Sequence, residues 1–164
     1  MSDTAGRHDG NGRHKTRLPT PKRKRWQLLR SGLLNLFHYA DEEFWYEDGR
    51  LLLRGNNGTG KSRVLALQLP FLLDAELNPT RMEPDRSPSK RPEWNLLLGG
   101  KHRDRLGYTW LEFGRVDDDG NAQFFTLGCG LHAVQDRGRT DAWFFTTDRR
   151  IGRDFTLTRD SVPH

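Results

Sequence analysis

The sequence predicts an α/β fold in which a short strand leads through a glycine-rich loop into a helix, with antiparallel β hairpins after it. Three observations support this prediction. The apolar run of residues 51–53 ends just before Gly55, and residues 50–54 have the length and composition of a strand. Residues 64–73 are apolar almost all the way round, as expected of a helix buried behind a sheet. Beyond residue 106, aromatic-rich segments alternate with turn sequences.

The 164-residue chain has a formal net charge of +5, and this charge is concentrated in its first part. Residues 1–25 contain eight Lys or Arg against two Asp, so residues 26–164 are close to neutral. Residues 1–25 are almost free of apolar side chains, and we expect a disordered basic tail followed by one folded domain at residues 26–164. The candidate contacts to nucleic-acid phosphates in this tail are Lys22, Arg23, Lys24 and Arg25. A solvated leader without function is the alternative.

Two strands are predicted before the strand that enters the loop. They cover residues 26–37 and 43–47, and the turn sequence Glu47-Asp48-Gly49-Arg50 connects the second of them to residues 50–54. This β-rich segment distinguishes the chain from simple kinase-like proteins, in which a phosphate-binding loop follows the first strand.

The loop matches the phosphate-loop pattern G-x-x-x-x-G-K-[ST]. Glycines permit positive φ angles and let successive N–H groups approach an anion, and the following helix adds its own N-terminal N–H groups. Lys61 would reach the β- and γ-phosphates, and the Ser62 hydroxyl would coordinate Mg²⁺. The predicted phosphate-binding residues are Gly55, Asn56, Asn57, Gly58, Thr59, Gly60, Lys61 and Ser62. The predicted cofactors are therefore ATP and Mg²⁺, and a plain glycine turn before a helix is the alternative.

The helix after the loop is predicted over residues 61–74, with a kink or a locally loosened last turn at Pro70, since proline removes a backbone hydrogen bond. Residues 75–92 are polar and proline-rich and are expected to be mobile, and residues 93–98 form a short helix. The remaining predicted strands are residues 107–115, 123–134 and 142–147, with turns at residues 118–121 and 136–140.

Four stretches carry a family resemblance: LLRSGLLNLFHYADEEFWYEDGRLLLRGNNGTGKS, PFLLDAELNPTRMEP, LLLGG and YTWLEFGR. They resemble the N-terminal head lobe of SMC-like ATPases, and most closely the MukB-like subunit of bacterial Wadjet-type condensin systems, which act against plasmids. The resemblance covers about residues 25–160. It implies a P-loop NTPase fold of the ABC/SMC-head type, of which this chain is the first lobe only. It also implies ATP-driven DNA binding and loop formation by a long protein with a coiled coil and a second head lobe.

The resemblance transfers functional roles to the phosphate loop, and it places Asn35-Leu36-Phe37 where such heads carry an Asn-aromatic motif near the nucleotide. Arg63 departs from the family, which often has Thr, Asn or Ser after the loop serine. Two further motifs of the family are absent. Asp74 ends an apolar run like a Walker B carboxylate, but it lies on the helix that follows the loop. Residues 97–101 (LLGGK) lack the serine of a signature motif, so both stretches are expected to be core and turn.

Other candidate sites are weaker. Cys129 is the only cysteine, which excludes an intramolecular disulfide and suits a reducing cytoplasm, and we expect it in the core. The histidines His38, His102 and His132 lack the spacing of a metal site, and residues 117–119 are expected to be a solvated acidic turn. No run is long enough to span a membrane, and no secretory signal precedes the domain. The expected location is the cytoplasm.

The function predicted from these residues and from the resemblance is ATP binding by one lobe of an SMC-like ATPase that acts on DNA, in plasmid defence. Its expected partners are DNA and the second head lobe or other subunits of a condensin-like complex. Hydrolysis by this chain alone is not expected, because the Walker B and signature motifs are missing. The alternatives are another P-loop NTPase completed by a partner chain, and a non-catalytic DNA-interaction fragment that kept the loop.

Overall fold

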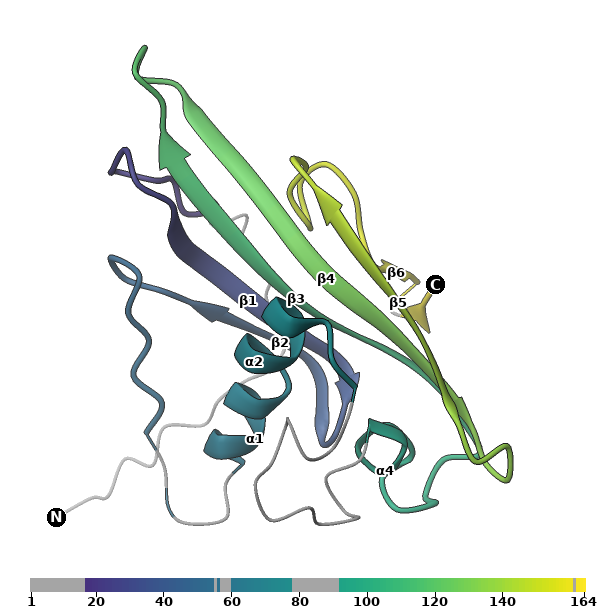
Figure 1. The fold of residues 1–164 in the computed structure, drawn as a ribbon. Coiled ribbons are helices and arrows are strands. Elements are labelled where there is room, and N and C mark those ends of the chain that lie inside the picture. Colours follow the sequence, from purple (N-terminus) through teal and green to yellow (C-terminus); the bar gives the residue numbers. More distant parts are fainter. Residues whose placement is uncertain (1–16, 55, 57–59, 78–91, 161) are drawn as a thin grey trace, which may run out of the picture.

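The computed structural model describes residues 17–54, 56, 60–77, 92–160 and 162–164. Five antiparallel strands form one sheet in the order β2-β1-β3-β4-β5, and short helices cover one of its faces (Figure 1). The sheet strands are β1 (Gln27–Leu36), β2 (Tyr39–Trp45), β3 (Asp104–Val116), β4 (Ala122–Val134) and β5 (Thr140–Thr147). The helices are α1 (Lys61–Ala66), α2 (Leu69–Asp74) and α4 (Pro92–Leu97). A separate hairpin pairs β6 (Thr158–Arg159) with β7 (Val162–Pro163).

The fold is mostly β, and the predicted α/β phosphate-loop fold of the ABC/SMC-head type is wrong. Residues 51–54 form no strand, and every pairing in the five-stranded sheet is antiparallel. The preceding turn is confirmed, because Glu47 and Arg50 exchange backbone hydrogen bonds of 2.9 Å. A strand also needs a partner for its N–H and C=O groups, however apolar its side chains are. Among the residues that the structure describes, the edge strand β2 pairs only with β1, and Leu52 is 71% exposed.

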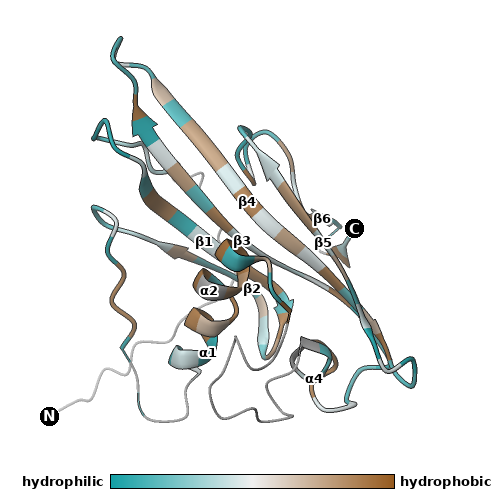
Figure 2. Cartoon of the chain, in the orientation of Figure 1, coloured by the Kyte–Doolittle hydropathy of each residue, from teal (hydrophilic) through white to brown (hydrophobic). Residues whose placement is uncertain are grey.

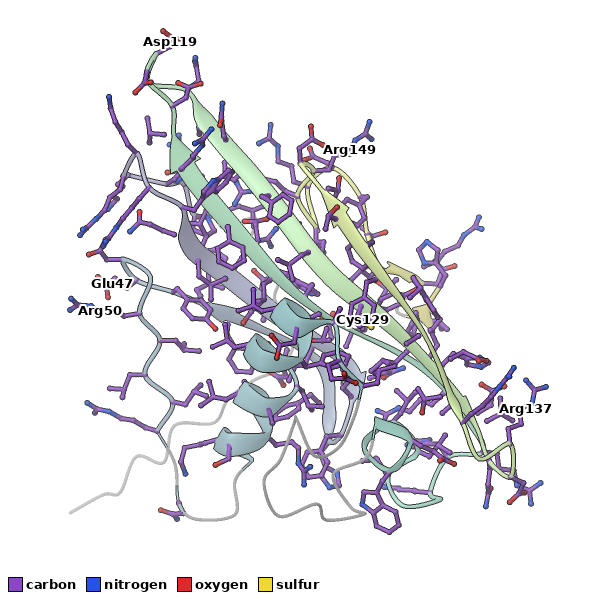
Figure 3. The ribbon with its side chains drawn as sticks, in the orientation of Figure 1. Glu47, Arg50, Asp119, Cys129, Arg137 and Arg149 are labelled. Carbon is purple, nitrogen blue, oxygen red and sulfur yellow. The ribbon has the colours of Figure 1, made fainter. Side chains whose placement is uncertain are left out.

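The other predicted strands are confirmed, with shifted ends. β2 begins at Tyr39, four residues before its predicted start at residue 43, and β3 and β4 form a long hairpin of unbroken register. At its tip the Asp117 carboxylate accepts hydrogen bonds from the N–H groups of Asp119 and Asn121, at 3.1 and 2.8 Å. Asp119 marks this tip in Figure 3, and Arg137 marks the β4–β5 turn at the opposite end of the sheet. The acidic residues 117–119 thus form the predicted turn.

The helix predicted at residues 61–74 is present, and residues 67–68 interrupt it. α1 ends at Ala66 and α2 begins at Leu69, with a proline in its first turn. Proline at position 70 has no N–H for the carbonyl of residue 66, and its ring would clash with that carbonyl, so the first helix ends there. The two helices are not buried on every side, since the apolar residues Leu65 and Leu73 are exposed.

The hydrophobic core lies between the sheet and these helices. We call this side the helix face, and Figure 2 shows hydrophobic residues along α1 and α2 and at alternating positions of the long strands. The buried residues of the core are Leu33, Leu36, Val64, Leu67, Phe71, Leu72, Leu96, Leu97, Leu111, Cys129, Leu131 and Ala133. The prediction that Cys129 belongs to the core is confirmed, and burial raises the pKa of its thiol to about 12.

The opposite side of the sheet, which we call the termini face, is crossed by chain from both ends of the domain. The carbonyl of Arg149 accepts a hydrogen bond from Thr126 on β4, Arg150 reaches Glu112 on β3, and the carbonyl of Ile151 accepts one from Arg30 on β1. The chain leaving β5 therefore crosses three strands at a large angle to them. The segment before β1 lies on the same face, since Arg150 also donates to the carbonyl of Pro19 at 2.7 Å.

Candidate functional site

The described part of the phosphate-binding loop lies at the start of α1. Gly60 is the N-cap residue, with φ 89° and ψ 3°, a left-handed conformation that favours glycine. A Cβ atom at this position would lie 2.5 Å from the Tyr39 hydroxyl, so space also requires glycine. The Tyr39 hydroxyl donates to the Gly60 carbonyl at 3.2 Å, and the N–H of Val64 donates to the same carbonyl at 3.0 Å. The loop is thus fastened to β2 where the helix begins.

Lys61 and Ser62 follow in the first turn of α1, which contains no acidic residue. The Lys61 ammonium donates to the carbonyl of Asn56 at 2.8 Å, so the lysine joins two described residues on either side of residues 57–59. Ser62 and Asn56 are exposed. The remaining predicted phosphate-binding residues, Gly55, Asn57, Gly58 and Thr59, lie outside the described residues.

The β1–β2 turn stands beside this helix start. The guanidinium of Arg63 lies 5.2 Å from the centre of the Phe37 ring, and that ring lies 6.2 Å from the ring of Tyr39. Arg63, the residue that departs from the family pattern, is therefore stacked on an aromatic ring. The sequence analysis did not identify Tyr39 or its bond to Gly60. Its position two residues after Phe37 of the Asn-aromatic motif could have indicated that it lies near the loop.

The residues of the predicted Asn35-Leu36-Phe37 motif contact different parts of the fold, and Leu36 belongs to the hydrophobic core together with Val64 of α1. Phe37 contacts α1 through Arg63, whereas the Asn35 side chain donates to the carbonyl of Leu106 on β3 at 3.3 Å. Arg105 supports the turn from the other side, with hydrogen bonds of 3.0 Å to the carbonyls of Phe37 and Leu96. Asn35 and Phe37 both adopt positive φ angles near 50°, which makes this a tight turn.

The two stretches that resemble the absent Walker B and signature motifs form part of the core and a turn, as expected. Asp74 is the last residue of α2, at the far end of the helical pair from Lys61. Leu97 is buried, and Leu98, Gly99 and Gly100 all adopt positive φ angles in the turn after α4. Neither stretch places a carboxylate or a hydroxyl beside Lys61.

The basic residues before β1 are partly neutralised by contacts with the sheet ends. Arg23 pairs with Asp48, and Lys24 pairs with Asp118 at 2.9 Å. The Arg23 carbonyl also accepts a hydrogen bond from the N–H of Val116 at 2.8 Å. Lys22 and Arg25 are exposed beside them, and residues 1–16 lie outside the described residues.

A buried ionic cluster on the termini face was not anticipated from the sequence. Arg30, Glu112 and Arg150 are 1%, 0% and 3% exposed. Arg30 donates to both oxygens of Glu112, at 3.0 and 2.7 Å, and Arg150 donates to one of them at 2.6 Å. A possible signal was one charged residue of each sign inside an apolar strand, Arg30 in QLLRSGLL and Glu112 in YTWLEFGR.

The cluster keeps Arg30 charged. Burial by itself would lower the pKa of the Arg30 guanidinium, but its hydrogen bonds to Glu112 and the charges of Glu112 and Glu43 outweigh burial and raise it. The side chain of Arg30 also stacks over Trp110, at 5.0 Å from the ring centre. A cavity of about 910 Å³ opens next to the cluster, with both acidic and basic residues in its lining.

The side chains with metal-binding chemistry in the described part of the chain are dispersed. The described residues contain no group of three His, Cys, Asp or Glu that could hold a metal ion, and His132 pairs with Asp104 at 2.8 Å. No helix in the described ranges is long and apolar enough to cross a membrane. The chain matches no protein-family model, no curated protein and no solved structure.

Proposed function

We propose that the loop of residues 55–62 binds the phosphates of ATP together with Mg²⁺, and that this chain is the ATP-binding lobe of an SMC-like ATPase acting on DNA. One observation carries the proposal. The phosphate-loop motif of the sequence ends in a left-handed Gly60 that leads directly into Lys61 and Ser62 in the first turn of α1. This is the order of groups that a phosphate-binding loop requires: a backbone turn, a cation and a hydroxyl.

Each described residue has a role in this proposal. Lys61 exchanges its bond to the Asn56 carbonyl for the β- and γ-phosphates of the nucleotide, and the exposed Ser62 hydroxyl coordinates Mg²⁺. Tyr39 holds the Gly60 carbonyl, so that the loop is attached to the sheet at the point where it meets α1. The first turn of α1 has no carboxylate that would repel an anion.

Hydrolysis requires more than these groups supply. A water must be positioned by a carboxylate or a glutamine, and the transferred phosphoryl group needs further charge stabilisation. Asp74 ends the stretch that resembles a Walker B motif, but it is the last residue of α2 and lies at the far end of that helix from Lys61. We therefore propose that turnover requires a second head lobe or a partner subunit of a condensin-like complex, with DNA as the substrate on which the assembly acts and plasmid defence as its role.

The test compares ATP binding by the wild type and by the Lys61→Ala variant, using titration with fluorescently labelled ATP and Mg²⁺. Loss of a charge-assisted contact of about 1.5–3 kcal/mol should weaken binding roughly ten- to hundred-fold. Lys101→Ala, at an exposed position after α4, is the matched control and should bind as the wild type does. Equal affinities of the wild type and Lys61→Ala would reject the site. Sustained phosphate release by the wild type alone, abolished in Lys61→Ala, would reject the need for a second lobe.

A further inference from the structure

The outer edges of the sheet differ in charge. On β2, one edge, three consecutive carboxylates (Asp41, Glu42 and Glu43) are exposed, which is a common way to prevent an edge strand from pairing with another chain. On β5, the other edge, the single charged side chain is that of Asp141 near the start of the strand. Within the described residues β4 is the only strand paired with β5. The N–H and C=O groups on its outer side therefore lack a strand partner.

The aromatic residues of β5 indicate that its outer side is suited to a further strand. Trp143 lies on the termini face and Phe144 on the helix face, and each is 41% exposed. Their inner halves are packed: Trp143 lies 5.9 Å from the ring of Tyr108, and Phe144 lies 5.8 Å from the ring of Phe71. An added strand would cover both rings at once, one on each face, because the side chains of a strand alternate between faces.

Within the described residues, no backbone hydrogen bond joins another segment to the outer side of β5. After β5 the chain turns back at Arg149 and crosses β4, β3 and β1 on the termini face. It ends in the β6–β7 hairpin (Figure 1), where the carbonyl of His164 accepts a hydrogen bond from Tyr108 on β3. The other edge repels its own copy through its carboxylates, and an open-ended β5-to-β2 contact would bury those carboxylates against aromatic rings. A closed pair of identical edges avoids both costs.

From these observations we infer that β5 pairs with β5 of a second copy of this chain, antiparallel and about a two-fold axis, to form one continuous ten-stranded sheet. This inference does not depend on nucleotide binding. Residues directly opposite each other must lie on the same face of the joined sheet. The register that meets this condition and centres the aromatic residues places Phe144 opposite Phe144 and Trp143 opposite Phe145. The carboxylate of Asp141 then lies opposite Thr147, so like charges do not meet.

The first experiment measures the mass of the full chain by light scattering over a dilution series. The wild type should show a concentration-dependent species of twice its 19.0 kDa mass. Phe144→Lys and Phe144→Glu should each weaken dimerisation at least about ten-fold, since like charges then meet at the two-fold axis. Mixing these two variants should restore a dimer. Leu73→Lys, at an exposed apolar position on α2, is the control and should leave the dimer unchanged.

A second measurement tests the register and does not rely on charged variants that could fold poorly. Opposite Cα atoms in an antiparallel pair lie about 4.5–5.5 Å apart, which is within reach of a disulfide. Phe144→Cys should form a covalent dimer under copper-catalysed air oxidation, whereas Ala142→Cys and Leu73→Cys should not. Buried Cys129 provides no competing thiol. A wild type that stays monomeric at every concentration, or a dimer that neither Phe144 variant weakens, would overturn the inference.

Discussion

The buried carboxylate of Glu112 connects three parts of the chain that are far apart in sequence. It accepts hydrogen bonds from Arg30 on β1 and from Arg150 in the segment after β5, and Arg150 in turn donates to the carbonyl of Pro19. Two buried guanidinium groups near one another are tolerable only with a carboxylate between them. Glu43, which also bonds Arg30, supplies the second negative charge from the edge strand β2.

At this scale we predict that Glu112→Gln lowers the free energy of unfolding by about 3–5 kcal/mol, because it removes the carboxylate that lies between two buried positive charges. The substitution keeps the shape of the side chain, so the loss reports the charge. Urea unfolding followed by tryptophan fluorescence measures it, with Glu42→Gln at an exposed position of β2 as the control. A Glu112→Gln variant within about 1 kcal/mol of the control would show that the cluster does not hold the termini face together.

On the termini face, two strand glycines leave space for an aromatic ring from the neighbouring strand. Gly32 on β1 lies opposite Trp110 on β3, and Gly130 on β4 lies opposite Trp143 on β5. Cβ atoms at these two glycines would lie 2.3 and 2.2 Å from the indole rings. Glycine inside a strand ordinarily weakens it, but here it allows a large ring from the neighbouring strand to lie flat on the sheet.

At the scale of elements we predict that Gly32→Ala destabilises the protein by about 1–3 kcal/mol, since the added methyl group would clash with the Trp110 ring and displace it. The double variant Gly32→Ala/Trp110→Leu removes the clash and should cost less than the sum of the two single variants. Thermal or urea unfolding of the four proteins completes the cycle. Simple additivity of the two substitutions would mean that the ring and the glycine do not constrain one another.

The positive charge of the whole molecule is concentrated next to the folded body. Residues 17–25 contain Arg17 and the four basic residues at 22–25, and no acidic residue. The structure pairs Arg23 with Asp48 and Lys24 with Asp118, while Lys22 and Arg25 stand exposed beside them. If the chain binds DNA as proposed, these two exposed cations are the ones best placed to meet phosphates.

At the scale of the whole molecule we therefore predict that the double variant Lys22→Ala/Arg25→Ala weakens binding to duplex DNA. It should also reduce the slope of log affinity against log salt by about 2, because two fewer counterion-releasing contacts form. Fluorescence anisotropy at several salt concentrations measures both quantities. The charge-matched variant Lys101→Ala/Arg137→Ala, near the opposite end of the sheet, should change them less. Equal slopes for the two variants would place the DNA contact elsewhere.

How much could be read from the sequence depended on how local each feature is. Alternating side chains and turn residues at 118–121 predicted β3 and β4, and the motif at residues 55–62 predicted where a helix would begin. These signals act within a few residues, through backbone preferences and side-chain periodicity. The interruption of the helix at residue 67 was equally local, because proline acts on the carbonyl four residues before it.

The tertiary structure decided the features that need a distant partner. Residues 51–54 have the composition of a strand and form none, since pairing is a property of two segments and not of one. Glu112 could not be assigned to Arg30 and Arg150 from the sequence, because those partners lie 82 and 38 residues away and meet only after the chain has crossed the sheet. The sequence by itself thus determined most strands, the turns and the loop motif. The antiparallel sheet and the buried charges were decided by contacts between segments that the chain brings together only on folding.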